Sequence, residues 1–97
     1  MSEALKVPGV IAIVTGADCD KGFGVLPIAR TEFPLARDKV RYRGEPVAAV
    51  AALDDDAARE ALRRIKFEVK ELPAYYTAKD AAAPGAALLH EKKPGNI

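Results

Sequence analysis

Few residues of this chain combine the type and spacing that chemistry requires. The sequence contains one cysteine, Cys19, and one histidine, His90. Cys19 lies between Asp18 and Asp20, and two neighbouring carboxylates disfavour the thiolate that a nucleophile needs. One cysteine and one histidine cannot complete a closed zinc site. His90 has Glu91 beside it, but adjacent side chains on an extended chain point apart, so we interpret Cys19 and His90 as structural or surface residues.

Two segments have part of a ligand-binding pattern. Residues 22–24 (GFG) match the start of a dinucleotide fingerprint, but Pro27 replaces the third glycine and no helix follows, which favours a turn. Residues 54–56 (DDD) offer the oxygen ligands of hard cations, yet capping of the helix that follows explains the same residues. We therefore predict no catalytic, cofactor-binding or metal-binding residue in this chain.

The candidate functional residues that remain are Arg41, Arg43 and Glu45. The two arginines alternate with Val40 and Tyr42, which places them on the wet face of a predicted strand. A charged strand face beside a tight turn can contact a neighbouring domain, an anion or a partner carboxylate. The alternative is that both arginines are solvated charges that protect a strand edge.

The predicted strands follow from the periodicity of apolar residues. Residues 10–15 and 47–53 are almost continuously apolar, a pattern typical of strands buried on both faces. Residues 40–43 alternate as a half-exposed strand, and the turn at 44–46 would join it to 47–53 as an antiparallel hairpin. Residues 67–72 alternate in the same way before Pro73 ends the strand.

The strongest helical pattern covers residues 57–65. Residues 54–56 supply an N-cap and negative charge at the start of this helix. Ion pairs between residues four apart support it, at Asp55–Arg59 and Glu60–Arg64. One face is apolar, and it consists of Ala58, Ala61, Leu62 and Ile65.

Weaker elements complete the predicted fold. They are a helical turn at residues 2–5 capped by Ser2, short extended pieces at 25–37, a Thr77-capped helix at 79–83 and a brief strand at 86–89. Tyr75 and Tyr76 could stack on a ligand, but anchoring of a loop is commoner for such a pair. One helix between strands and one antiparallel hairpin together predict an α+β class, with a small mixed β-sheet and about two helices.

Composition excludes several classes of protein. A chain of 97 residues predicts a single domain, and its net charge of +1 argues against a nucleic-acid surface. No apolar stretch reaches the roughly 18 residues of a membrane span, and the first residues lack a secretory signal. The expected location is the cytoplasm.

Three segments in this order resemble the α/β-hammerhead domain of the xanthine dehydrogenase and aldehyde oxidase family. They are residues 8–18 (PGVIAIVTGAD), 36–53, and 58–74 (AREALRRIKFEVKELPA), and residues 83–97 (APGAALLHEKKPGNI) match the way that domain ends. Residues 44–48 (GEPVA) are the most specific element. Residues 18–37 (DCDKGFGVLPIARTEFPLAR) are most similar to the large subunit of 4-hydroxybenzoyl-CoA reductase.

The resemblance implies a structural domain in the large subunit of a molybdopterin-dependent oxidoreductase. In the complete enzyme it implies molybdopterin in that subunit, with [2Fe-2S] clusters and FAD in partner domains or subunits. The pterin-contacting segments and the catalytic glutamate of the family belong to later domains, so no such residue is transferred to this chain. The isolated chain is expected to be non-catalytic.

The start of the chain departs from the family pattern, because a hammerhead domain normally has another strand region before the segment that matches residues 2–5. We therefore expect a fragment of a larger subunit. Two alternatives remain open: a free-standing binding or assembly module with the same fold, and an aldehyde or carbon monoxide oxidoreductase relative.

Overall fold

The computed structural model describes residues 1–25 and 30–97, which form two compact units, Met1–Phe67 and Glu68–Ile97. Each unit is described by itself. Part of the predicted segment 25–37, including Pro27, lies outside the described residues. The interpretation of the chain as a single domain stays a prediction.

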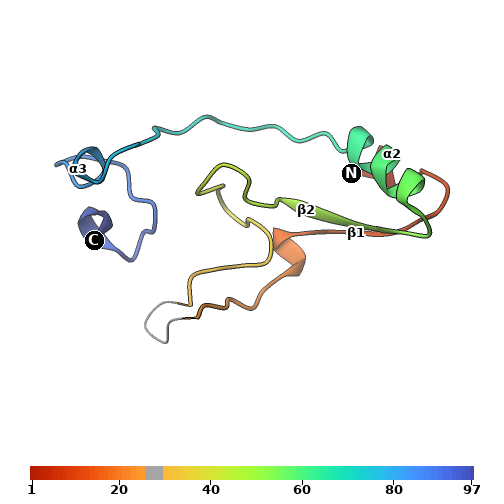
Figure 1. Cartoon of the computed structure of the whole chain (residues 1–97), viewed down its shortest axis with the longest axis horizontal. Coiled ribbons are helices and arrows are strands. Elements are labelled where there is room, and N and C mark those ends of the chain that lie inside the picture. The colour runs from red at the N-terminus through yellow and green to blue at the C-terminus, as the bar shows by residue number, and fades with distance from the viewer. Residues whose placement is uncertain (26–29) are drawn as a thin grey trace. The chain divides into compact units, whose positions relative to one another are not determined.

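The first unit is built on a two-stranded antiparallel sheet (Figure 1). Strand β1 (Val10–Thr15) pairs with β2 (Ala48–Ala52), and a bulge interrupts the register between Val10 and Ala12. The Leu53 N–H extends the ladder by donating to the Gly9 carbonyl at 2.8 Å. The predicted hairpin partner of β2 was therefore wrong. Residues 40–43 form no strand, and β2 pairs instead with a segment far away in sequence.

Only one face of this sheet is covered in the part of the chain that the structure describes. Val10, Ile13, Val50 and Ala52 pack against the helices, and the alternate residues of β2 are exposed. The prediction of strands buried on both faces was wrong for these described residues. Small helices cover a single side, so the continuously apolar sequence leaves apolar side chains in water on the other.

The core lies between the sheet and two helices, α1 (Ser2–Leu5) and α2 (Asp55–Arg64). Its buried residues are small: Ala4, Val7, Ala57 and Ala61. Short side chains allow the helix backbones to lie close to each other and to the sheet. Because no large side chain among residues 1–25 and 30–97 is fully buried, this core can contribute only modest hydrophobic stabilisation.

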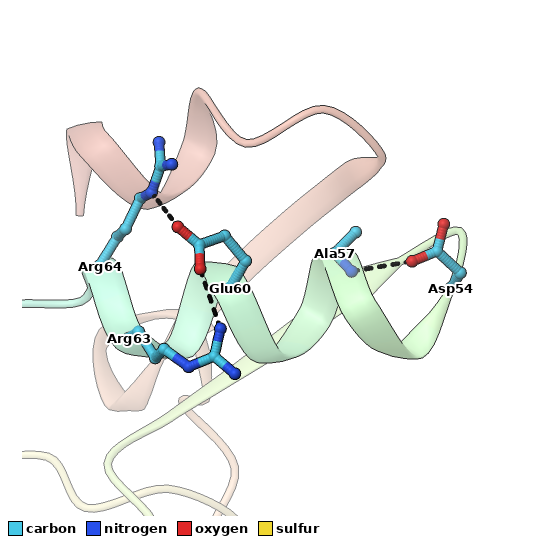
Figure 2. Close-up of polar contacts among 5 residues, drawn as sticks. All are labelled: Asp54, Ala57, Glu60, Arg63 and Arg64. Carbon is cyan, nitrogen blue, oxygen red and sulfur yellow. Dashed lines mark hydrogen bonds and ion pairs between the residues drawn. The ribbon is translucent and has the colours of Figure 1, made fainter.

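Helix α2 is capped as predicted, but it begins two residues earlier than expected and turns a slightly different face to the core. The Asp54 carboxylate accepts from the Ala57 N–H at 2.8 Å, which caps the helix (Figure 2). Ala61 is buried, but Leu62 is 54% exposed, because the inward face is centred on Ala57, Ala61 and Ile65. The predicted position of Leu62 on the covered face was therefore wrong.

Helix α1 confirms the predicted turn but not its cap. The N-cap position is Met1, whose side chain makes no capping hydrogen bond, and Ser2 is the first helical residue. The Lys6 ammonium instead bonds the Glu3 carboxylate at 2.6 Å across one turn. Because both side chains are exposed, this pair adds little to stability.

A compact loop follows β1. The short 3-10 helix η1 (Gly16–Asp18) carries a capping box, in which the Thr15 hydroxyl accepts from the Ala17 N–H at 3.3 Å. Gly16 is buried beneath the backbone of Ala36, and Ala36 N–H donates to the Pro46 carbonyl at 2.7 Å. These contacts tie the middle of the chain to the end of β1.

The second unit has little regular structure. Helix α3 (Ala78–Ala81) is capped by Thr77, whose hydroxyl accepts from the Asp80 N–H at 3.1 Å, and a 3-10 turn η2 (Pro94–Asn96) ends the chain. The cap was predicted correctly, and the helix is shorter than expected. The predicted strands at 67–72 and 86–89 are absent from the described residues, where neither segment is assigned as a strand.

These elements confirm the predicted α+β class, with fewer strands among the described residues than expected. The sheet in the described residues is antiparallel, where a mixed sheet was predicted. No helix among residues 1–25 and 30–97 has the length and apolar character to cross a bilayer.

Candidate interface surface

The three predicted interface residues lie on one closed turn before β2. Gly44 adopts a φ of +91°, a conformation that glycine reaches without strain, and the Glu45 N–H donates to the Tyr42 carbonyl at 3.2 Å. The Glu45 carboxylate accepts from the Arg41 backbone N–H at 2.5 Å. Glu45 therefore stabilises its own turn and presents the exposed Arg43 at the tip. A role for these residues in an interface stays a prediction.

A second surface was missed by sequence reasoning. Apolar side chains are exposed along β1 and β2 on and beside the uncovered face of the sheet: Ile11, Val14, Ala49, Ala51 and Leu53. Leu53 is 78% exposed, and Val14 pairs with Ala49 across the two strands. We call these five residues the bare sheet face. The signal was present in the continuously apolar strand sequence, but it was interpreted as burial on both sides.

The bare sheet face differs chemically from the charged turn. It contains no ionisable group, and two of its five side chains are the methyl groups of alanine. Exposed apolar patches rimmed by polar residues are typical of surfaces that meet another protein surface. The first unit therefore offers an apolar surface on the sheet and a charged one at the Arg43 turn.

Cys19 and His90 lie in different units of the described structure. Cys19 is a half-buried free thiol that follows the η1 turn. His90 lines a shallow apolar pocket at the end of the second unit, together with Leu89, Lys93, Asn96 and Ile97. Among the described residues, no group of three or more His, Cys, Asp or Glu side chains is placed to hold a metal ion.

The aspartates at residues 54–56 act at the start of α2. Asp54 provides the cap, and Asp55 and Asp56 lie exposed in the first turn, where negative charge favours the helix dipole. The capping interpretation is confirmed. At the other end of the helix, Glu60 bonds Arg64 at 2.7 Å and Arg63 at 3.0 Å (Figure 2).

Residues 22–24 form part of a local chain reversal. Phe23 and Glu32 exchange two backbone hydrogen bonds, of 2.8 and 3.1 Å, in an isolated antiparallel bridge. These bonds consume the backbone groups of Phe23 that a phosphate-binding loop would direct at its ligand. No turn is assigned at residues 22–24, so the turn interpretation stays a prediction.

The tyrosine pair divides between two environments. The Tyr75 hydroxyl accepts from the Ala87 N–H at 2.9 Å and so anchors the loop that follows α3. Tyr76 is 92% exposed. Tyr75 therefore anchors a loop, but neither tyrosine packs on a core as predicted, since Tyr75 is itself 39% exposed.

Two carboxylates in the first unit have lowered pKa values. The Thr15 backbone N–H, and then its hydroxyl, donate to the Asp18 carboxylate and hold the pKa of Asp18 below its ordinary value. The hydrogen bond from Arg64, followed by that from Arg63, lowers the pKa of Glu60. Both groups are exposed and serve as local caps and pairs, which is a structural use of charge.

Asn96 is a structural residue that the sequence did not single out. Its side-chain amide donates to the Ala81 carbonyl at 2.8 Å and the Ala87 carbonyl at 3.1 Å, and its oxygen accepts from the Leu89 N–H at 2.7 Å. Its φ of +57° lies in the left-handed region, which asparagine tolerates better than most residues. The Gly-Asn sequence near the end of the chain was the available signal.

Comparison with known proteins gives a consistent result. Residues 1–73 match the family model described as aldehyde oxidase and xanthine dehydrogenase, a/b hammerhead domain. The chain is 41% identical over 96 residues to a probable xanthine dehydrogenase subunit of Bacillus subtilis, covering 98% of this chain and 12% of that protein. It is 35% identical over 104 residues to an aldehyde oxidoreductase of Megalodesulfovibrio gigas, covering 96% of this chain and 11% of the relative.

A solved structure has a closely similar fold. The aldehyde oxidoreductase from Desulfovibrio gigas superposes with a TM-score of 0.80 at 32% identity, over 96% of this chain and 11% of that one. The chain thus spans about an eighth or less of the length of these relatives.

Proposed function

Because this chain belongs to the aldehyde oxidase and xanthine dehydrogenase a/b hammerhead family, we propose that it is a structural domain of the molybdopterin-binding large subunit of a molybdenum-dependent oxidoreductase. The observation that carries the proposal is 41% identity along nearly the whole chain to a relative of which it is only 12%. Its likeness to the solved aldehyde oxidoreductase, with a TM-score of 0.80, supports the same assignment.

An architectural role agrees with the surfaces of the first unit. The bare sheet face is apolar, and the core cluster beneath the opposite face is built from small buried side chains. Small domains with thin cores are commonly stabilised by association. In this proposal, contact with the remaining domains of the subunit supplies the missing burial, and Arg41, Arg43 and Glu45 contribute charged contacts at the rim.

The redox groups of the family do not fit this chain's own residues. A [2Fe-2S] cluster needs four protein ligands, usually cysteines, and the chain has one cysteine. The carboxylates of Asp18, Asp54 and Glu60 already accept local hydrogen bonds. We therefore propose that molybdopterin, the iron-sulfur clusters and FAD are held by the other domains and subunits of the enzyme.

Two substrate classes are proposed in order. The resemblance of residues 18–37 supports an enzyme that removes a phenolic hydroxyl from an aromatic coenzyme A thioester, as in 4-hydroxybenzoyl-CoA reductase. The likeness to aldehyde oxidoreductases in sequence and structure supports oxidation of an aldehyde as the second candidate. Assaying the complete enzyme with both substrates and an artificial electron carrier separates them.

The proposed role is tested by comparing the complete enzyme with the 97-residue chain. We expect molybdenum and turnover in the complete enzyme, and neither molybdopterin nor turnover in the chain purified alone. Deleting these residues from the complete subunit should abolish its assembly. Pterin retained by the chain alone, or turnover by it, would overturn the proposal.

A further inference from the structure

The side chain of Arg37 stacks on an aromatic ring. Its Cζ atom lies 5.1 Å from the centroid of the Phe33 ring. The ring in turn lies against the loop at Gly22, where an added Cβ would be 3.5 Å from a ring carbon. Arg37 is exposed, and among the described residues of the first unit no carboxylate forms an ion pair with it. A stacked guanidinium keeps its N–H edge available for a planar anion.

The backbone around Arg37 is held by two further contacts. Gly16 lies against it, since a Cβ atom on Gly16 would be only 2.9 Å from the Arg37 Cα. The Ala36 N–H donates to the Pro46 carbonyl at 2.7 Å. Arg37 therefore combines a fixed backbone with a supported side chain, so little conformational entropy remains to be lost when an anion binds the guanidinium.

The bond between Ala36 and Pro46 closes a loop that carries an excess of positive charge. Residues 37–45 (RDKVRYRGE) contain four cations and two carboxylates, which gives this segment a net charge of +2. One of the two carboxylates, that of Glu45, already accepts from the Arg41 backbone N–H. The charge of this loop therefore favours a negatively charged group on the surface that meets it.

We propose that Arg37, supported by Phe33, binds a carboxylate side chain of another domain of the large subunit. The proposal rests on the proposed function, because that function supplies the other domains. A carboxylate matches a guanidinium with two parallel N–H···O bonds, and arginine is enriched among the residues that dominate the binding energy of interfaces. The chain accounts for only 11–12% of two of its relatives, so most of the carboxylates in those proteins lie outside it.

Chemical modification of arginine tests whether Arg37 is engaged. Phenylglyoxal reacts with free guanidinium groups, and peptide mass spectrometry gives the rate at each site. We expect Arg37 to react at least about tenfold more slowly in the complete enzyme than in the 97-residue chain. Acetylarginine added to each sample calibrates the reagent. Equal rates at Arg37 in the two samples would overturn the proposal.

Carbodiimide coupling of an Arg37→Lys variant of the complete enzyme identifies the acid. A carbodiimide joins an amine to a carboxylate that contacts it, and the substitution places an amine where the guanidinium lay. We expect a cross-link from residue 37 to an Asp or Glu of the large subunit outside these 97 residues. Arg30→Lys, at another exposed arginine of the first unit, is the matched control and should not give this product. A cross-link within the 97 residues or to another subunit, or none, would overturn the proposed partner.

Phe33→Leu tests the support that the ring provides. The variant keeps an apolar side chain beside Gly22 but removes the aromatic face. The protection of Arg37 in the complete enzyme should therefore fall about two- to fivefold. Phe23→Leu is the matched control, because Phe23 is an exposed phenylalanine of the same loop and should leave the rate at Arg37 unchanged. Equal effects of the two substitutions would remove the ring from the proposal.

The inference about Arg37 and the proposed function fail on different results. If the enzyme contains molybdenum and turns over while Arg37 reacts as fast as in the isolated chain, the carboxylate contact is wrong and the proposed function stands. A large subunit that contains these residues but assembles without molybdenum removes the proposed function instead.

Discussion

Gly16 lies directly against the peptide group of Ala36. A Cβ atom on Gly16 would be 2.0 Å from the Ala36 carbonyl oxygen and 2.9 Å from the Cα of Arg37. No side chain fits at such distances, so the backbone of the middle segment rests on the end of β1 because residue 16 has no side chain. The Ala36–Pro46 hydrogen bond holds the same segment from its other side.

We therefore predict that Gly16→Ala destabilises the first unit. The loop at residues 36–37 must move, which strains the bond between Ala36 and Pro46, and overpacking of this kind costs about 1–3 kcal/mol of unfolding free energy. Urea unfolding followed by circular dichroism measures the change. Ala17→Ser is the matched control, because residue 17 is adjacent and exposed. An unchanged midpoint for Gly16→Ala would contradict the close contact.

Gly9 provides a second test, in which backbone strain and steric contact are separated. Gly9 and Gly44 have φ values of +88° and +91°, so alanine at either site costs about 1–2 kcal/mol of strain. A Cβ on Gly9 would also lie 3.1 Å from the Cβ of Ala57, whereas nothing lies within 4 Å of one on Gly44. Gly9→Ala should therefore lower the unfolding midpoint more than Gly44→Ala does. Equal changes in the two unfolding midpoints would mean that α2 moves away from the added Cβ at residue 9 without a cost in free energy.

These contacts show which parts of the fold could be predicted from the sequence. Local patterns predicted the sites of β1 and α2, and the caps by Asp54 and Thr77, because each depends on residues within a few positions. The pairing of β1 with β2 and the position of Gly16 under Ala36 join residues far apart in sequence. No periodicity of a single segment specifies which distant segment will lie against it.

Two predictions about extended segments were wrong for a related reason. Residues 67–72 were predicted as a strand from their alternation, and the described structure assigns no strand there. The residues 47–53 were predicted to be buried on both sides, and only one side is covered. In both cases the pattern of apolar residues indicates the pairing or burial that suits the segment. The described residues show only part of that pairing or burial.

The charged turn before β2 gives a prediction about assembly. Reversing Arg43 to Glu should weaken association of this domain with the rest of the enzyme, because an exposed cation at the turn tip would then be replaced by an anion that repels a partner carboxylate. Rim charges change association by about 0.2–1 kcal/mol, so we expect a shift of up to about fivefold in the assembled fraction at low salt. Analytical size exclusion at low and high salt measures it. Lys21→Glu is the control, since Lys21 is also exposed.

Arg41→Glu tests the other arginine of the turn. The backbone N–H that donates to the Glu45 carboxylate is present in this variant, while the side-chain charge is reversed. If both arginine variants assemble like the Lys21→Glu control at both salt concentrations, the assigned interface role is wrong.

Asp18 makes the η1 turn sensitive to acid. Its pKa lies below the ordinary 3.8 because the Thr15 N–H and hydroxyl donate to its carboxylate. A carboxyl with a lower pKa in the folded state stabilises that state above its unfolded pKa. This contribution is lost as pH falls below about 4 toward the folded pKa. Thr15→Val removes the hydroxyl and keeps the N–H, the larger cause, so the pKa should rise only part of the way.

Carbon-detected NMR titration of the Asp18 carboxyl measures its pKa in the unmodified chain and in Thr15→Val. Asp18→Asn is the companion variant, because an amide does not titrate and the corresponding acid dependence of stability should disappear. A pKa at or above 3.8 in the unmodified chain would contradict the capping geometry.

Asn96 should control the order of the second unit. Its amide donates to the carbonyls of Ala81 and Ala87 and its oxygen accepts from the Leu89 N–H, so one side chain joins three separate backbone positions. Asn96→Asp keeps an acceptor for Leu89 but directs oxygen at two carbonyls, whereas Asn96→Gly removes all three bonds and leaves the positive φ unstrained. Each lost bond costs about 0.5–1.5 kcal/mol, so the Leu89 amide should exchange about tenfold faster in Asn96→Gly and change less in Asn96→Asp. Residue-resolved hydrogen exchange measures this order, and the reverse order would mean that Leu89 is protected by another group.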